Sequence, residues 1–435
     1  MDDRKPGGRR RPVAIRTWRA AAALAVVVAS AALALSASCA RKPITPTKVI
    51  FLGIDAADWG LMQPLLEEGK LPNFSRLVAE GATGKLATLQ PLQKSPVIWT
   101  SIGTGVLPDK HGIGGFLAPA RGGEEVPFTG NVRRAKAIWN ILGEKGLRVA
   151  VVGWMVTWPA EEVNGYMVSD YIQYENEKGI KPERQTYPES LFDEIDHLRL
   201  TEAQVGDADI AAIYPVSAPA DKLSPDDWHK GYVKMVYATD ETFRRVALHL
   251  RREGVEFLAV YFNGVDSLCH GFWDFRDKPD HPLSGVIDDY YVWIDGVLGE
   301  FMKLVDRETL LVVCSDHGFR GPGRTADGAL MLGIYMHGDY GIVGLMGDSV
   351  RKGARILDAD VLDITPTVLY SLGYPVAKDM DGTVITDAFT DDYLRSNPVA
   401  FVPTYETGER QAGAPVSSPV DDKVRAKLKA LGYIQ

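Results

Sequence analysis

The sequence has few cysteines, an excess of acidic residues and no internal repeats. Its three cysteines are Cys39, Cys269 and Cys314, too few for a disulfide framework, so the fold depends on a packed core. The formal net charge is −9, with 48 Lys and Arg against 57 Asp and Glu. This balance argues against a protein that binds the phosphate backbone of nucleic acids, and it offers no broad attraction to anionic lipid headgroups.

Positive charge is nevertheless concentrated before residue 20. The basic residues of that stretch are Arg4, Lys5, Arg9, Arg10, Arg11, Arg16 and Arg19. Residues 20–35 are apolar except for Ser30, and small residues then lead into a polar segment. A basic segment, an apolar run and small residues in this order are typical of a bacterial export signal. We therefore predict that residues 1–40 direct export to the periplasm or the outer face of the cell membrane.

Three fates of this signal remain open. Cleavage after Ala40 fits the small residues at positions 38 and 40. Lipidation of Cys39 would attach the protein to a membrane, although a lipobox has Leu where this sequence has Ser36. Residues 20–40 are also about long enough to cross a bilayer as an uncleaved anchor. The last two fates predict membrane association.

The rest of the chain alternates between apolar runs and amphipathic stretches. Predicted strands are 48–54, 148–154, 257–262, 310–315 and 342–346. Predicted helices are 59–68, 75–80, 135–144, 232–252, 287–305 and 365–372. Strands that alternate with helices indicate an α/β fold whose mostly parallel central sheet is covered on both faces.

The domain boundaries follow from where this alternation starts, fades and stops. Residues 41–47 contain two prolines and are predicted to be a linker before a catalytic domain, residues 48–395. The alternation fades over about 158–228, which is rich in proline, so we predict an inserted cap there that selects the substrate. Residues 396–435 are predicted to be a tail that ends in a short helix.

Metal-binding side chains follow three of the predicted strands. They are Asp55 after the first strand, Asp266 and His270 after 257–262, and Asp316 and His317 after 310–315. The carboxyl ends of parallel strands meet at one edge of a sheet, so these residues are expected to lie together. Carboxylates and imidazoles suit two divalent cations, with Zn²⁺ favoured and Mn²⁺ the alternative. Cys269 and Cys314 lie beside them, which leaves open a disulfide or two buried thiols.

A nucleophile is predicted at Ser95, in the segment Lys94-Ser95-Pro96. A serine at the start of a helix can face a bound phosphoryl group, and a nearby cation lowers the pKa of its hydroxyl. Lys94 and the amides after Ser95 are candidates for stabilising the phosphoryl oxygens. A simple helix cap at Ser95 is the structural alternative, with Thr100 and Ser101 as competing nucleophiles.

The order Asp, hydroxyl, Asp-x-x-x-His, Asp-His-Gly, His resembles that of the alkaline phosphatase superfamily. Within it, the chain is most similar to the type I phosphodiesterase/nucleotide pyrophosphatase branch and its uncharacterised bacterial relatives. The likeness extends from residue 48 to residue 389 and implies a three-layer α/β/α sandwich. It also implies Ser95 as nucleophile and His337 as a further ligand. The implied ligands are Asp55, Ser95, Asp316 and His317 for one cation, and Asp266, His270 and His337 for the other.

Two departures from related enzymes narrow the expected substrate. Nucleotide pyrophosphatases have an Asn three residues after the nucleophile, where this sequence has Ile98, which argues against nucleotide diesters. The sulfatase signature is absent around Ser95, which argues against a sulfatase. The resemblance, with the predicted export signal, therefore implies an exported hydrolase of small phosphoric esters, with diesters favoured, that forms a covalent phosphoserine. The alternatives are a phosphoryl or phosphoethanolamine transferase at the cell envelope, and a non-catalytic, metal-stabilised binding protein.

Overall fold

The computed structural model describes Met1 and residues 44–119, 124–216, 228–325, 330–407 and 412–434. Apart from Met1, the predicted export signal, residues 1–40, lies outside the described residues, as do residues 41–43 of the predicted linker. In the described part of the chain, no helix is long and apolar enough to cross a membrane.

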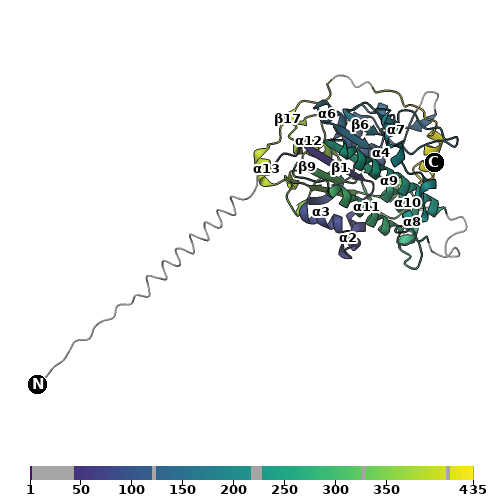
Figure 1. The fold of residues 1–435 in the computed structure, drawn as a ribbon, viewed down its shortest axis with the longest axis horizontal. Helices are drawn as coiled ribbons and strands as arrows, with labels where there is room; N and C mark the ends of the chain where they lie inside the picture. The colour runs from purple at the N-terminus through teal and green to yellow at the C-terminus, as the bar shows by residue number, and fades with distance from the viewer. Residues whose placement is uncertain (2–43, 120–123, 217–227, 326–329, 408–411, 435) are drawn as a thin grey trace. The chain divides into compact units, whose positions relative to one another are not determined.

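A nine-stranded sheet forms the centre of the described fold (Figure 1). In spatial order the strands are β15 (Ala354–Ile356), β2 (Ala82–Ala87), β14 (Tyr340–Met346), β9 (Thr309–Cys314), β1 (Lys48–Ile54), β8 (Phe257–Phe262), β5 (Val149–Val152), β6 (Gly165–Val168) and β7 (Thr186–Tyr187). The five strands from β9 to β6 run parallel to one another, whereas β14 is antiparallel to both β9 and β2, and β7 is antiparallel to β6. The predicted mostly parallel sheet is confirmed.

Helices cover both faces of this sheet because successive strand residues point to opposite sides. In β1, Ile50 and Leu52 enter one core and Val49 and Phe51 enter the other. The first core is covered by α2 (Trp59–Glu67), α3 (Pro72–Glu80), α9 (His229–Arg252), α10 (Gly264–Arg276) and α11 (Val286–Met302). The second is covered by α4 (Ser95–Thr104), α6 (Ile138–Glu144) and α12 (Ile364–Ser371). The three-layer α/β/α architecture is therefore confirmed.

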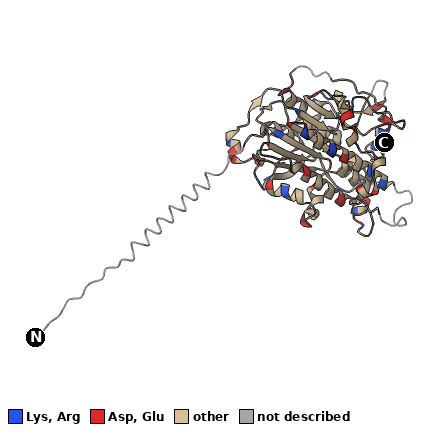
Figure 2. Cartoon of the chain, viewed as in Figure 1, with Lys and Arg blue, Asp and Glu red and all other residues tan. Residues whose placement is uncertain are grey.

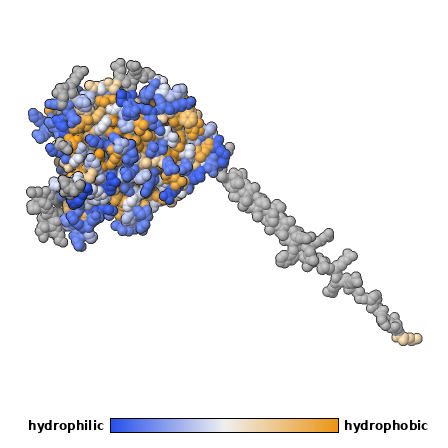
Figure 3. Space-filling view, turned by 180° about the vertical axis from the view of Figure 1, so that it is seen from behind, coloured by the Kyte–Doolittle hydropathy of each residue, from blue (hydrophilic) through white to orange (hydrophobic). Residues whose placement is uncertain are grey.

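Shorter elements complete the described fold. They are α5 (Pro108–His111), β3 (Leu117–Pro119), β4 (Glu125–Pro127), α7 (Leu191–Ile195), α8 (Asp207–Ile210), β10 (Gly318–Phe319), β11 (Gly323–Arg324), β12 (Leu330–Met331), β13 (His337–Gly338), β16 (Val376–Ala377), α13 (Asp391–Ser396), β17 (Phe401–Val402) and α14 (Asp421–Ala430). Acidic and basic residues lie side by side on the surface helices (Figure 2). The opposite face also mixes hydrophilic and hydrophobic side chains (Figure 3).

Two features of the sheet differ from the sequence prediction. The prediction has no strand at β2, whose mixed sequence Ala-Thr-Gly-Lys-Leu-Ala lacks a continuous apolar run. This segment forms a strand because it pairs with β14 and β15, which come from distant parts of the sequence. The segment 158–228, predicted as a cap, contributes β6 and β7 to the central sheet. Its first thirty residues therefore include sheet strands, and the cap as a substrate-selecting unit stays a prediction.

The two described cysteines are free thiols, both buried. Cys314 packs in the core on one side of the sheet, and Cys269 packs in the core on the other side. The disulfide that the sequence left open is not formed in this structure.

A buried histidine holds α4 against α5 and generates a testable pH dependence. The ring Nδ1 of His111 accepts a hydrogen bond from the Ile113 amide at 3.1 Å, and its Nε2 lies 2.9 Å from Ser101 Oγ. Burial, together with the positive charges of Arg133 and Arg134, lowers the pKa of His111 to about 3. The ring is therefore neutral in the folded protein.

We expect His111 to destabilise the fold as the pH falls from about 6.5 towards 3. In that range His111 binds a proton in the unfolded chain but not in the folded protein. The free energy of unfolding therefore falls by up to about 1.4 kcal/mol per pH unit. Urea unfolding at pH 7, 6, 5 and 4 measures the slope. The variant His111→Gln should show a shallower loss of unfolding free energy with acid, and an unchanged slope would contradict the assignment.

Candidate metal centre

The parallel strands deliver the predicted ligands to one edge of the sheet. Ile54 of β1 pairs with Phe262 of β8, and Gly53 pairs with Cys314 of β9, so these three strands end level with one another. Asp55 is the first residue after β1. In this way a shared register brings together residues more than 200 positions apart.

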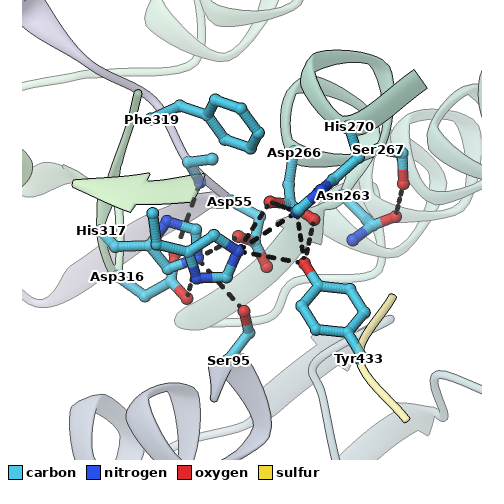
Figure 4. A network of polar contacts seen from close by, with 12 residues as sticks. Asp55, Ser95, Asn263, Asp266, Ser267, His270, Asp316, His317, Phe319 and Tyr433 are labelled. Atoms are coloured by element: carbon cyan, nitrogen blue, oxygen red, sulfur yellow. Dashed lines mark hydrogen bonds and ion pairs between the residues drawn. The ribbon is translucent and has the colours of Figure 1, made fainter. Parts of the chain in front are cut away.

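The first group of candidate ligands comprises Asp55, Asp316 and His317, all fully buried. His317 Nε2 lies 3.3 Å from Asp55 Oδ1 and 3.3 Å from Asp316 Oδ2. The same nitrogen lies 3.2 Å from Ser95 Oγ, which approaches from the start of α4 (Figure 4). Four donor atoms from three elements of the fold therefore converge at one point.

The second group comprises Asp266, His270 and His337. Asp266 and His270 lie one turn apart on α10, and His337 comes from β13, which pairs with β10 just after His317. His270 Nε2 lies 3.2 Å from His337 Nε2, and Asp266 Oδ1 lies 3.4 and 3.6 Å from these two nitrogens. The rings of His317 and His337 stack with centroids 3.6 Å apart, so the two groups are adjacent.

The donor atoms of both groups fit divalent cations. Three buried carboxylate oxygens have no hydrogen-bond partner among the described residues: Asp55 Oδ1, Asp266 Oδ1 and Asp316 Oδ2. His317 Nδ1 donates to the Gly318 carbonyl at 2.9 Å, which leaves the lone pair of Nε2 directed at these oxygens. Unsatisfied buried oxygens and imidazole nitrogens that point at one another are the donor set that Zn²⁺ or Mn²⁺ would satisfy.

The pKa values of Asp55 and Asp316 show that burying the three carboxyl groups close together opposes their ionisation. Burial raises the pKa of Asp55 to about 6, and the charge of Asp266 acts in the same direction. Burial and the neighbouring Asp55 raise the pKa of Asp316 well above its ordinary value. Burial also opposes ionisation of Asp266, but the adjacent His270 and His337 hold its pKa below the ordinary value. Bound cations would remove this repulsion by supplying positive charge.

Two side chains that the sequence analysis did not identify orient Asp55. Its Oδ2 accepts hydrogen bonds from Trp99 Nε1 at 3.0 Å and from the Tyr261 hydroxyl at 2.5 Å. These bonds leave Oδ1 to face His317. Trp99 lies one turn after Ser95 on α4, so that helix carries both the nucleophile candidate and a support for the first ligand.

The helix that carries Asp266 and His270 is anchored at its N-terminus by Asp240 of α9. The Asp240 carboxylate accepts from the amides of Asn263 and Gly264 at 3.1 and 2.9 Å. It also accepts from the Tyr290 hydroxyl at 2.8 Å. A Cβ atom at Gly264 would lie 2.1 Å from that hydroxyl oxygen, so only glycine fits at the start of α10. This contact positions α10 over the end of β8.

The structure separates Ser95 from its alternatives as nucleophile. The N-cap of α4 is Lys94, and the Ser95 hydroxyl faces His317 and makes no cap bond. The Thr100 hydroxyl donates to the Pro96 carbonyl at 2.7 Å, and Ser101 contacts His111 at 2.9 Å. Of these three hydroxyls, the one at Ser95 is at the candidate metal centre.

The oxyanion donors suggested by the sequence need a correction. Pro96 has no N–H group, and the amides of Val97 and Ile98 both donate to the Lys94 carbonyl, at 2.9 and 3.2 Å. The amides that follow Ser95 are therefore committed to the helix, because its first turn closes on the Lys94 carbonyl. The Lys94 side chain is half-buried and runs close to Gly115. Ile98 is fully buried in the core, so it offers no contact to a substrate.

A cavity of about 700 Å³ opens beside Ser95 and Asp266. Asn263 also lines it. The rest of its wall includes aromatic and aliphatic side chains and lysines of α9 and α14. These include Phe116, Tyr171, Met235, Lys234 and Lys427. A substrate whose reacting group lies at Ser95 has room for an organic substituent here.

Tyr433 lies at the candidate metal centre, although the sequence analysis gave it no role. Its hydroxyl lies 3.0 Å from Asp266 Oδ2, 2.8 Å from His270 Nε2 and 3.1 Å from His337 Nε2 (Figure 4). The predicted short helix is present as α14, but the tail around it was not assigned a role at the site. No local sequence signal marks Tyr433, since a lone tyrosine after a helix-ending glycine is common in ordinary packing.

A comparison with a solved structure agrees with this fold. Alkaline phosphatase PafA matches with a TM-score of 0.53 at 13% identity, over 80% of this chain and 100% of that one. Phosphonoacetate hydrolase from Sinorhizobium meliloti 1021, solved with phosphonoformate, matches with a TM-score of 0.40 at 18% identity, over 66% of this chain and 60% of that one. At such identities, a match with a TM-score above 0.5 shows the fold alone.

A curated relative matches over a shorter stretch. It is GPI ethanolamine phosphate transferase 3 from Schizosaccharomyces pombe, 27% identical over 152 residues. The match spans 34% of this chain and only 15% of the length of that relative. A family model described as type I phosphodiesterase/nucleotide pyrophosphatase matches residues 49–324, which is more than half of the chain. The chain therefore belongs to the type I phosphodiesterase/nucleotide pyrophosphatase family, with an alkaline phosphatase-like fold.

Proposed function

We propose that this chain is a phosphoester hydrolase that works with two divalent cations and uses Ser95 as its nucleophile. Asp55, Asp316 and His317, with Ser95, would hold one cation, and Asp266, His270 and His337 the other. The observation that carries the proposal is the position of Ser95, whose Oγ lies 3.2 Å from His317 Nε2 and which lines the cavity. Family membership supports the same reaction class.

Different residues of the chain would have different roles in such a reaction. When bound, the two cations would supply Lewis acidity that neutralises phosphoryl oxygens and favours ionisation of the Ser95 hydroxyl. Ser95 Oγ forms a bond to phosphorus while the bond from phosphorus to the leaving alcohol breaks, which yields a phosphoserine. Water then hydrolyses that ester and restores the serine. Trp99, Tyr261 and Asp240 keep the ligands in place throughout.

A phosphodiester is the substrate class that we propose. The cavity of about 700 Å³ beside Ser95 accommodates an organic group on the phosphate. Ile98 occupies the position at which nucleotide pyrophosphatases have an Asn, and its side chain is buried in the core. This argues for small diesters other than nucleotides. Zn²⁺ is the favoured metal and Mn²⁺ the alternative, because the donors are imidazoles and carboxylates.

The curated relative favours a second candidate function. A match to an ethanolamine phosphate transferase is consistent with a transferase that passes the phosphoryl or phosphoethanolamine group from Ser95 to an alcohol instead of water. Such an enzyme would show little turnover until an acceptor is added, whereas a hydrolase needs water alone. A non-catalytic, metal-stabilised envelope protein would bind cations and show neither activity. Export through residues 1–40 stays a prediction for all three functions.

Replacement of Ser95 by alanine tests the nucleophile. Ser95→Ala should lower the turnover of p-nitrophenyl phosphodiesters by on the order of 10³-fold or more, because the competing hydroxyls of Thr100 and Ser101 are engaged elsewhere. Its metal content should change little, since the Asp and His donors remain. The measurement uses a panel of p-nitrophenyl monoester, diester, phosphonate and sulfate substrates on metal-loaded protein.

Ser101→Ala is the matched control, because it removes a buried hydroxyl from the same helix. This variant loses the contact with His111 and should be less stable, yet it should keep near-normal turnover per folded molecule. If Ser95→Ala instead retains wild-type rates, the assignment of the nucleophile fails.

Removal of the cations should abolish activity and lower the melting temperature. Each cation present at about 1,000 times its dissociation constant adds about 4 kcal/mol to the free energy of unfolding, because the unfolded chain does not hold the site. Chelation followed by thermal unfolding measures this change, and added Zn²⁺ or Mn²⁺ should reverse it. Unchanged rates and melting temperature after exhaustive chelation would exclude the two-cation proposal.

A further inference from the structure

Tyr433 reaches the candidate metal centre because the chain turns sharply after α14. Gly432 has a φ of 78°, a left-handed conformation that ends the helix. The Tyr433 amide then donates to the Leu428 carbonyl at 2.9 Å, which fixes the turn. Gly333, near His337, also has a positive φ of 65°, and a Cβ atom there would lie 2.6 Å from the Gly432 carbonyl oxygen. The turn is therefore packed directly against the segment that delivers His337.

The surroundings of the Tyr433 ring hold its hydroxyl in place. The ring packs against Phe116 with centroids 4.6 Å apart, and the residue is buried. It also lines the cavity together with Ser95 and Asp266. The phenol oxygen therefore lies between the cavity and the second group of ligands.

The distances around this oxygen resemble the edges of a coordination tetrahedron. Zn–N and Zn–O bonds of about 2.0–2.1 Å place neighbouring donors about 3.3 Å apart. The Tyr433 oxygen lies 2.8 Å from His270 Nε2, 3.1 Å from His337 Nε2 and 3.0 Å from Asp266 Oδ2. The two imidazole nitrogens are 3.2 Å apart, and Asp266 Oδ1 lies 3.4 and 3.6 Å from them. The Tyr433 oxygen therefore lies at the spacing of a neighbouring donor from both imidazole nitrogens and from one oxygen of Asp266.

Hydrogen bonds alone satisfy this cluster poorly. A phenol has one proton to donate, and a carboxylate oxygen and two imidazole nitrogens lie within 3.1 Å of its oxygen. Asp266 Oδ1 and His337 Nδ1 are buried without a hydrogen-bond partner among the described residues. A single cation among these four side chains would attract all of the converging lone pairs at once.

We propose that Tyr433 is a fourth protein donor to the cation held by Asp266, His270 and His337. The inference rests on the proposed two-cation centre and adds a ligand from outside the family match, which ends at residue 324. Each cation then has four protein donors, because Ser95 is the fourth donor of the first. A phosphoryl oxygen that reaches the second cation must displace the Tyr433 oxygen or bind beside it.

The test is the variant Tyr433→Phe, which removes only the phenol oxygen and keeps the ring that packs on Phe116. We expect its affinity for one of the two cations to fall by about tenfold to 100-fold, as losses of groups at metal sites commonly do. The other affinity should stay unchanged. Competition with a chelator of known affinity measures both constants, and the visible absorption of the Co²⁺-loaded protein should also change because its coordination changes.

Tyr393→Phe is the matched control. It removes a buried phenol oxygen that donates to the Ser371 carbonyl at 2.8 Å, in the packing between α13 and α12. Both cation affinities and the Co²⁺ spectrum should equal those of the wild type. Thermal unfolding of both variants separates a general loss of stability from a loss at the metal centre.

The outcomes distinguish this inference from the function on which it rests. If the wild type binds two cations and Tyr433→Phe binds both with the same affinity and the same Co²⁺ spectrum, Tyr433 is not a ligand. The proposed function stands in that case. If the wild type binds fewer than two cations, the two-cation centre and the role of Tyr433 both fail.

Discussion

Three carboxylates buried within a few ångströms of one another are the physical constraint on which the site depends. Asp55, Asp266 and Asp316 are removed from water, and each has an oxygen without a hydrogen-bond partner among the described residues. Burial favours their protonated forms, as the raised pKa values of Asp55 and Asp316 show. A protein that keeps such a cluster gains from it only when positive charge can enter. The two proposed cations would satisfy that condition, and they would explain why His270 and His337 point their nitrogens at each other.

The sheet creates this cluster through register, and the helices refine it. Level ends of β1, β8 and β9 bring the ligands to one edge of the sheet. Polar contacts from neighbouring elements then set the orientations: Trp99 and Tyr261 hold one oxygen of Asp55, and Asp240 holds the start of α10. These supporting residues are buried and would read as ordinary core residues in the sequence. Their role depends on which atoms they meet after folding.

The cavity beside the candidate metal centre is lined in part by segments whose place in the fold the sequence did not predict. Segment 158–228 contributes β6 and β7 to the sheet and other residues to the cavity wall, α14 contributes lysines, and the turn after it contributes Tyr433. We therefore expect substrate choice to depend on several segments of the chain. The same arrangement would serve hydrolysis or transfer, according to whether water or an alcohol reaches the proposed phosphoserine.

Short-range patterns in the sequence determined the class of fold and the order of the site residues. Apolar runs of strand length are followed by Asp55, by Asp266 and by Asp316. They predict strand ends that carry ligands, because a buried parallel strand is apolar along its length and polar binding residues follow its carboxyl end. The tertiary structure alone decided that β2 pairs as a strand and that the amides after Ser95 stay in the helix. It also decided that Tyr433 reaches the second group of ligands. These features depend on contacts between residues far apart in the chain, and no local pattern encodes such contacts.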